Sequence, residues 1–199
     1  MSLWLCTEGG ESERPPFCRN LLKRIELYFF PHRENDALNL RDFSRLLQEY
    51  FDGNFIAGFV NWEDALNYLG RKAQDQRTVL IIDEFPFLAE TNPSIKSILQ
   101  HKIDHDWKDR NLFLILCGSS VSFMLNDVMG YKSPLYGRST GCMEILPFDY
   151  LESAAFFTNY SEEDKMIAYG ILGGVLRYLN AFDPERFLLY RMSLASGGG

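Results

Sequence analysis

The sequence lacks the features of a membrane or secreted protein. No apolar run approaches the roughly 20 residues of a membrane-spanning helix, and no secretory hydrophobic region follows Met1. The four cysteines are scattered and form no Cys-x-x-Cys pair, so neither a zinc site nor a disulfide framework is indicated. A reducing, cytoplasmic setting fits these absences best, and we expect a cytoplasmic protein without a membrane partner.

Positive charge is also scarce in this chain. Lys and Arg number 20 against 27 Asp and Glu, and the formal net charge is −7 at pH 7. Nucleic-acid binding relies on clustered cations, so the sequence carries no clear nucleic-acid footprint and argues against a general nucleic-acid binder, although it leaves a local basic patch open. What is present is apolar: 46% of the 199 residues are hydrophobic and 15% are aromatic. That is enough for the core of one ordinary domain, with part of a second.

Short apolar runs alternate with stretches of helical periodicity. The runs that predict strands, apolar on both faces, are residues 25–30 (IELYFF), 78–82 (TVLII) and 111–118 (NLFLILCG). Apolar residues at helical spacing predict helices over about 40–51, 62–72 and 93–107. Strands that alternate with helices in this way predict an α/β fold, with a parallel sheet flanked by helices.

Polar side chains follow two of the predicted strands. Asp83 and Glu84 come directly after residues 78–82, and Ser119 and Ser120 come directly after residues 111–118. Ligands bind outside the carboxyl ends of the strands in open α/β sheets, where these residues fall. An apolar run that ends in Asp-Glu is typical of a Walker B segment, in which Asp holds Mg²⁺ and Glu orients or deprotonates the attacking water. The alternative is a strand that ends with both acids in solvent.

Three other groups of residues favour ordinary surface roles. His101 and His105 lie four apart on a predicted helix, but without a third ligand a solvated polar face is the better interpretation than a metal site. His32 follows a predicted strand and could approach a nucleotide, although a loop histidine is the simpler reading. The serines at 119–122 lack the Gly-x-Ser-x-Gly elbow, which argues against a serine hydrolase.

Several segments together carry a resemblance to a known family. In chain order they are VLIIDEFPFL, LFLILCGSSVSFM, SPLYGRSTG, ILPFDY and LGGVLRYL. Over residues 27–182 the chain resembles the archaeal-type P-loop ATPases of the AAA+/STAND superfamily. The resemblance implies a P-loop ATPase core over residues 25–150 and the start of a helical lid over 151–199, with the turn into the lid at Pro147-Phe148.

The resemblance also implies an activity and roles for particular residues. It implies an ATP hydrolase that uses Mg²⁺, with Asp83 as the Mg²⁺-linked Walker B aspartate and Glu84 as the catalytic glutamate. Ser119 or Ser120 would occupy the sensor 1 position and read the γ-phosphate. Arg138 would match an arginine that could act as a finger across a subunit interface, so the implied partners are a nucleotide and a second copy or another protein.

The chain departs from the family pattern at both ends. The phosphate-binding sequence Gly-x-x-x-x-Gly-Lys-Ser/Thr occurs nowhere in these residues, and Leu176 stands where the family has proline after Leu-Gly-Gly-Val. The chain also stops soon after the lid begins, so we expect a truncated lid without the family's usual C-terminal region. In a shifted reading frame the codons of residues 7–15 can encode Tyr-Gly-Arg-Arg-Arg-Val-Gly-Lys-Thr. Residues 1–24 are therefore interpreted as a frameshifted N-terminus over strand 1 and the Walker A motif.

Two functions remain open from the sequence. The first is an ATP-binding and ATP-hydrolysing enzyme, expected to be inactive as translated because GGESERPP carries two acids and no lysine. The second is a non-hydrolytic interaction module, or an inert remnant of such an ATPase. As the chain is written, the sheet is also expected to lack its first strand, leaving an unpaired strand edge.

Overall fold

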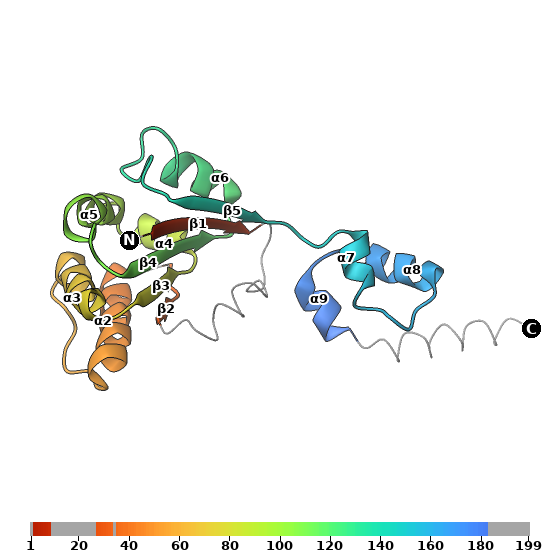
Figure 1. Cartoon of the computed structure of the whole chain (residues 1–199), viewed down its shortest axis with the longest axis horizontal. Helices are drawn as coiled ribbons and strands as arrows, with labels where there is room; N and C mark the ends of the chain where they lie inside the picture. Colours follow the sequence, from red (N-terminus) through yellow and green to blue (C-terminus); the bar gives the residue numbers. More distant parts are fainter. Residues whose placement is uncertain (1, 9–26, 34, 183–199) are drawn as a thin grey trace, which may run out of the picture. The chain divides into compact units, whose positions relative to one another are not determined.

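The computed structural model describes residues 2–8, 27–33 and 35–182. Their contacts divide into two compact units, an α/β unit that ends at Ile145 and a helical unit that begins at Leu146 (Figure 1). From the sequence, the boundary is expected a few residues later, between 150 and 151.

A five-stranded sheet forms the centre of the α/β unit, and every pairing in it is parallel. In spatial order its strands are β2 (Leu27–Phe29), β3 (Thr78–Ile82), β4 (Leu112–Gly118), β1 (Ser2–Glu8) and β5 (Gly141–Ile145). Figure 1 shows them in this order from bottom to top. The expected parallel α/β sheet is confirmed, with strands at all three predicted runs. Strand β4 separates β3 from β1, so the carboxyl end of β4 lies between the ends of its two neighbours.

The prediction that the chain lacks its first strand is wrong. Strand β1 pairs with β4 from Ser2↔Phe113 to Thr7↔Gly118 and with β5 from Trp4↔Gly141 to Glu8↔Ile145. Its partners lie more than 100 residues away in the sequence, and local periodicity contains no information about such pairing. The rest of the proposed frameshifted segment, residues 9–24, lies outside the described residues.

Four of the described helices pack on one face of the sheet. They are α2 (Asp36–Asp52), α3 (Trp62–Asp75), α4 (Phe85–Thr91) and α5 (Ile95–His101), the last continuing into a π-helical turn η1 (Lys102–Asp106). Asn35 and Asn61 cap α2 and α3 by accepting hydrogen bonds from the backbone N–H groups of Leu38 and Asp64. The shared core is built from residues that are almost fully buried, including Phe43, Leu47, Leu66, Leu80, Phe85, Trp107 and Leu114.

The opposite face of the sheet carries a smaller apolar cluster. Its buried members are Ile81, Ile115 and Cys117, and Tyr28, Val79, Phe113 and Ile145 pack against them. Successive strand residues point to opposite faces, so Ile81 belongs to this face while Leu80 and Ile82 belong to the larger core. Both faces of β3 are therefore apolar, as a covered parallel strand requires.

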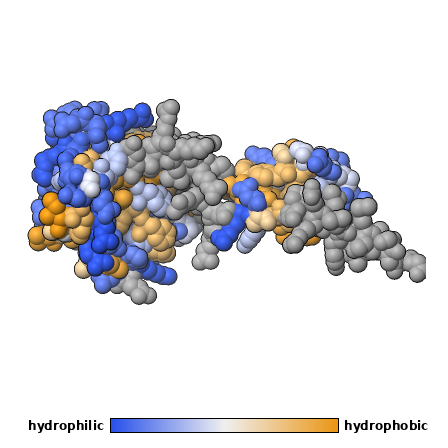
Figure 2. All heavy atoms as spheres, turned by 90° about the horizontal axis from the view of Figure 1, so that it is seen from below, coloured by the Kyte–Doolittle hydropathy of each residue, from blue (hydrophilic) through white to orange (hydrophobic). Residues whose placement is uncertain are grey.

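The described part of the helical unit contains α7 (Tyr150–Ala154), α8 (Glu162–Leu172) and α9 (Leu176–Ala181), which pack around Phe157, Tyr160, Ala168 and Leu179. Asp149 and Glu152 form a capping box at the start of α7. Gly173 ends α8 with φ 62°, and a Cβ on Gly174 would overlap the carbonyl of Phe148. Figure 2 shows apolar residues gathered on the visible face of this unit. The large apolar side chains that the unit exposes are Leu146, Leu151, Phe156, Met166, Ile171 and Tyr178. Among the helices in the described ranges, none is long and apolar enough to cross a bilayer.

Candidate functional site at the carboxyl edge of the sheet

Asp83 is held at the end of β3 from three directions. Its backbone N–H donates to the carbonyl of Phe29 at 2.9 Å, which extends the β2–β3 ladder by one residue. Its Oδ1 accepts the backbone N–H of Glu84 at 3.0 Å, and its Oδ2 accepts the hydroxyl hydrogen of Tyr28. Asp83 is half-buried, so its carboxylate is neither fully hydrated nor enclosed by apolar groups. Its two oxygens are instead fixed by one donor from β2 and one from the turn that follows β3.

Glu84 has an unusual backbone conformation. With φ 46° and ψ 46° it is the one non-glycine residue in the described part of the chain with a positive φ. This left-handed conformation costs a side-chain-bearing residue about 1 kcal/mol, and such strain clusters at functional sites. The turn lets helix α4 begin at once, and the Glu84 carbonyl accepts the N–H of Phe87 at 2.9 Å. As a result, the Glu84 carboxylate lies at the carboxyl ends of the strands.

The end of β4 lies beside the end of β3. The Ser119 backbone N–H donates a long 3.5 Å hydrogen bond to Oε2 of Glu84. Close packing brings the two segments together, since a Cβ on Gly118 would lie 2.8 Å from Cδ of Pro86 in α4. Ser120 is exposed, and its Oγ accepts the N–H of Phe123 at 3.3 Å, which caps the short helix α6 (Val121–Phe123) before the π-helical turn η2 (Met124–Val128).

Arg138 lies at the other edge of the sheet. It lies three residues before the start of β5, and Asp104 lies in η1 before β4, so both belong to the amino ends of the parallel strands. Nε and Nη2 of Arg138 donate to the two oxygens of Asp104 at 2.8 and 2.6 Å, and Nη1 donates to the carbonyl of Tyr136 at 3.0 Å. Hydrogen bonds from Arg138 lower the pKa of Asp104, and the same bonds raise the pKa of Arg138. Arg138 is therefore separated from Asp83 and Glu84 by the length of the strands.

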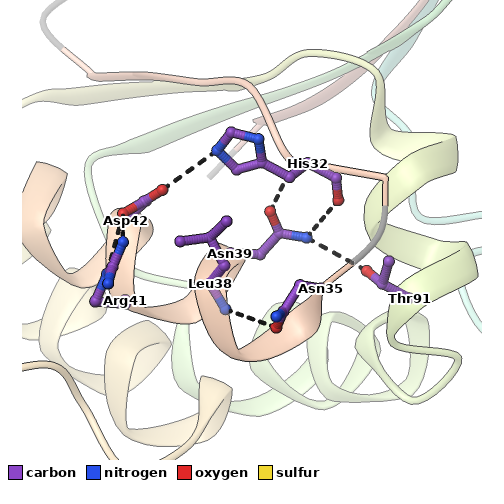
Figure 3. A network of polar contacts seen from close by, with 7 residues as sticks. All are labelled: His32, Asn35, Leu38, Asn39, Arg41, Asp42 and Thr91. Atoms are coloured by element: carbon purple, nitrogen blue, oxygen red, sulfur yellow. Dashed lines mark hydrogen bonds and ion pairs between the residues drawn. The ribbon is translucent and has the colours of Figure 1, made fainter.

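The side-chain amide of the buried Asn39 connects the loop after β2 to helix α2. Figure 3 shows Asn39 accepting the backbone N–H of His32 at 2.6 Å and donating to the carbonyl of His32 at 2.8 Å. The imidazole Nε2 of His32 lies 3.3 Å from Oδ2 of Asp42. Beside this loop is an open hollow of about 530 Å³, and its described lining residues are His32, Arg33, Asn35 and Leu38. The histidine ring thus has a carboxylate partner on α2.

The two histidines on the helical segment before β4 lie close to each other and to a carboxylate. The rings of His101 and His105 lie 4.8 Å apart, and Nδ1 of His101 is 4.0 Å from Oδ2 of Asp106. Within the described ranges, no group of three or more His, Cys, Asp or Glu side chains is placed to hold a metal ion. The polar-face interpretation of this segment stays a prediction.

The residues at the carboxyl edge fit the way in which proteins bind Mg²⁺ with nucleotides. Mg²⁺ keeps several waters and takes one or two carboxylates together with the substrate's phosphates, so a three-carboxylate cluster is not required. Asp83 and Glu84 supply two half-buried carboxylates on consecutive residues, and the Ser119 N–H supplies a donor beside them. Such a set can bind a hydrated cation and orient a water molecule.

Two residues that matter to this geometry were not predicted from the sequence. Tyr28 lies in a short apolar run, where a tyrosine indicates only a core position. Asp104 lies on a helix rich in charges, where each carboxylate is equivalent by sequence. The contacts of both residues depend on partners at least 34 residues away, and no local pattern identifies such partners.

Comparison with protein families gives a match over most of the chain. A family described as an ATPase domain predominantly from Archaea matches residues 18–182. An uncharacterized protein of Methanocaldococcus jannaschii is 39% identical over 119 residues, which are 60% of this chain and 26% of that protein. A second uncharacterized protein of the same organism is 35% identical over 92 residues, 43% of this chain and 86% of that protein. The chain therefore spans about a quarter of the first relative.

Solved structures share the fold at low sequence identity. A Walker-type ATPase of Pyrococcus abyssi is 18% identical with a TM-score of 0.61, covering 98% of this chain and 67% of that one. The Orc1 protein of Aeropyrum pernix, solved in complex with DNA, is 13% identical with a TM-score of 0.50, covering 83% of this chain and 44% of that one. At these identities the likeness shows the arrangement of strands and helices.

Proposed function

Because this chain belongs to the family of P-loop ATPase domains found predominantly in Archaea, we propose that its carboxyl edge is the Mg²⁺ and water side of an ATP-hydrolysing site. The observation that supports this most directly is the strained Glu84, which follows Asp83 at the end of β3 and accepts a hydrogen bond from the end of β4. A strand that merely ended in solvent would not need a left-handed glutamate. It would also not need donors on both oxygens of the preceding aspartate.

Each residue has a distinct role in this proposal. Asp83 would hold Mg²⁺ through its waters, and the ion would neutralise charge on the phosphates. The carboxylate of Glu84 orients the attacking water and takes its proton. Ser119 and Ser120 lie on the strand end between β3 and β1, where a backbone N–H or a hydroxyl can respond to a γ-phosphate. Arg138 acts as an arginine finger in the site of a second copy of the chain, because the sheet separates it from Glu84 of the same chain.

As written, the chain is proposed to bind Mg²⁺·ATP very weakly and not to hydrolyse it. Affinity for a triphosphate comes largely from a phosphate loop, whose N–H groups and lysine surround the phosphates. The sequence contains no such loop. An interaction module without hydrolysis is therefore the second candidate, and the exposed apolar side chains of the helical unit favour it.

Two experiments distinguish the ATP hydrolase from the interaction module. They are calorimetry with Mg²⁺·ATP and resequencing of the gene across codons 1–24. The chain as written should give no micromolar binding, whereas a version with residues 1–24 in the alternative frame should bind ATP. That version should also gain thermal stability on binding, since a ligand that binds only the folded state stabilises it. Micromolar binding by the chain as written would show that its phosphate site does not need the missing motif. No binding by either version would favour the interaction module.

A further inference from the structure

Tyr28 lies diagonally across the β2–β3 pair from Asp83. In the parallel register Tyr28 is opposite Ile81, and the hydrogen bond from the Asp83 N–H to Phe29 continues that register to the strand end. Side chains two residues apart on a strand share a face, so Tyr28, Ile81 and Asp83 face the same side of the sheet. A tyrosine can span the distance to a diagonal neighbour, as the hydroxyl hydrogen bond to Asp83 shows.

The ring and the hydroxyl of Tyr28 have different environments. The ring packs against the apolar cluster of Ile81, Ile115 and Cys117, which fixes its position. The hydroxyl reaches the half-buried carboxylate at the edge of that cluster. Tyr28 is therefore a rigid donor anchored in the sheet, and a rigid donor restricts the rotamers of the carboxylate that it contacts.

We propose that Tyr28 is a positioning residue, which sets the orientation of the Asp83 carboxylate for a hydrated divalent cation. The inference rests on the proposed function of Asp83 and adds a residue to it. Within the described part of the chain, Asp83 accepts one hydrogen bond on each oxygen, from Tyr28 on Oδ2 and from the Glu84 N–H on Oδ1. Each carboxylate oxygen has a further lone pair, so both remain able to accept a hydrogen bond from a cation-bound water. Loss of such an orienting partner typically weakens metal affinity by about 10- to 100-fold.

The structure supplies a matched control for removal of the hydroxyl. Tyr68 in α3 donates to Oδ2 of Asp52 in α2 at 2.6 Å, which is also a tyrosine–carboxylate pair. That pair connects two helices and takes no part in the carboxyl edge of the sheet. Tyr28→Phe and Tyr68→Phe each keep the ring and remove one hydroxyl donor. If only Tyr28→Phe weakens cation binding, the effect comes from the position of that donor beside Asp83.

The first measurement tests the hydrogen bond without any ligand. Urea unfolding of the full chain, Tyr28→Phe, Asp83→Ala and the double variant gives a double-mutant cycle. We expect the two substitutions to be non-additive by about tenfold in the unfolding equilibrium constant, the lower end of the scale of one hydrogen bond to a charged group. Additive effects would show that Tyr28 and Asp83 do not interact energetically, and this result would overturn the inference.

The second measurement uses Mn²⁺ alone as the probe of the cation site. Broadening of the Asp83 carboxyl NMR signal, assigned with Asp83→Ala, reports Mn²⁺ binding even at millimolar affinity. Tyr28→Phe should weaken this binding about tenfold, and Tyr68→Phe should leave it unchanged. Equal affinity of the chain and Tyr28→Phe would overturn the positioning role alone. If Mn²⁺ does not broaden Asp83 in the unsubstituted chain, the proposed Mg²⁺ role of Asp83 fails and the positioning role fails with it.

Discussion

The guanidinium of Arg138 binds the carboxylate of Asp104 at two points, with N–O distances of 2.8 and 2.6 Å. The two side chains are about a quarter and a third exposed, so the ion pair lies at the surface of the α/β unit. It connects the turn before β5 to the π-helical turn η1. This pair holds the candidate arginine finger at the amino ends of the strands, away from Asp83 and Glu84 of the same chain.

The contribution of the Arg138–Asp104 pair to stability should depend on pH. Hydrogen bonds from Arg138 lower the pKa of Asp104 in the folded state, whereas an unfolded aspartate titrates near pH 4. The stabilisation is thus fully present above about pH 4 and is lost as the pH falls through the lower folded pKa. Urea unfolding should show Asp104→Asn to be less stable by up to about 1 kcal/mol at pH 7. The difference should shrink below pH 3, and a constant difference would contradict the ion pair.

Arg138→Ala should lower ATP turnover with little loss of ATP affinity, if the arginine acts across a subunit interface. The test needs the version with residues 1–24 in the alternative frame. Mixing Arg138→Ala with Glu84→Gln should restore part of the activity, because one mixed interface then combines an intact glutamate with an intact arginine. If the mixture stays as inactive as its components, Arg138 acts within its own subunit or has no catalytic role.

Glu84→Gln in the same version should retain ATP binding and lose turnover by about 10²- to 10⁴-fold, since the amide keeps the shape but cannot accept the proton. Steady-state hydrolysis and calorimetry measure the two quantities separately. Glu90 in α4 gives a matched control, because it is exposed and pairs with Arg33. Glu90→Gln should hydrolyse ATP at the normal rate. An unchanged kcat in Glu84→Gln would remove Glu84 from the mechanism.

The left-handed backbone of Glu84 should reverse the usual order of alanine and glycine. At this position Glu84→Gly should be more stable than Glu84→Ala by about 1 kcal/mol, since glycine adopts a positive φ without the Cβ penalty. Arg71 is exposed within α3, and there the alanine variant should be more stable than the glycine variant by about 1 kcal/mol. Urea unfolding of the four variants decides the point. The same order at both positions would contradict the left-handed conformation.

The sequence by itself determined the elements whose signal is local. The apolar runs at 78–82 and 111–118 became β3 and β4, and the helical spacing after Asn35 and Asn61 became α2 and α3. The adjacency of Asp83 and Ser119 also followed from the sequence, because parallel strands present their carboxyl ends at one edge.

Only the tertiary structure decided the rest. Ser2–Glu8 is a central strand because β4 and β5 offer it backbone hydrogen bonds on both sides. Gly141–Ile145 became β5 although its residues remain partly exposed at the sheet edge. The Tyr28–Asp83 and Arg138–Asp104 contacts join residues 55 and 34 positions apart. Periodicity reports which face of an element is buried, whereas these strands and contacts depend on which distant segment packs beside it.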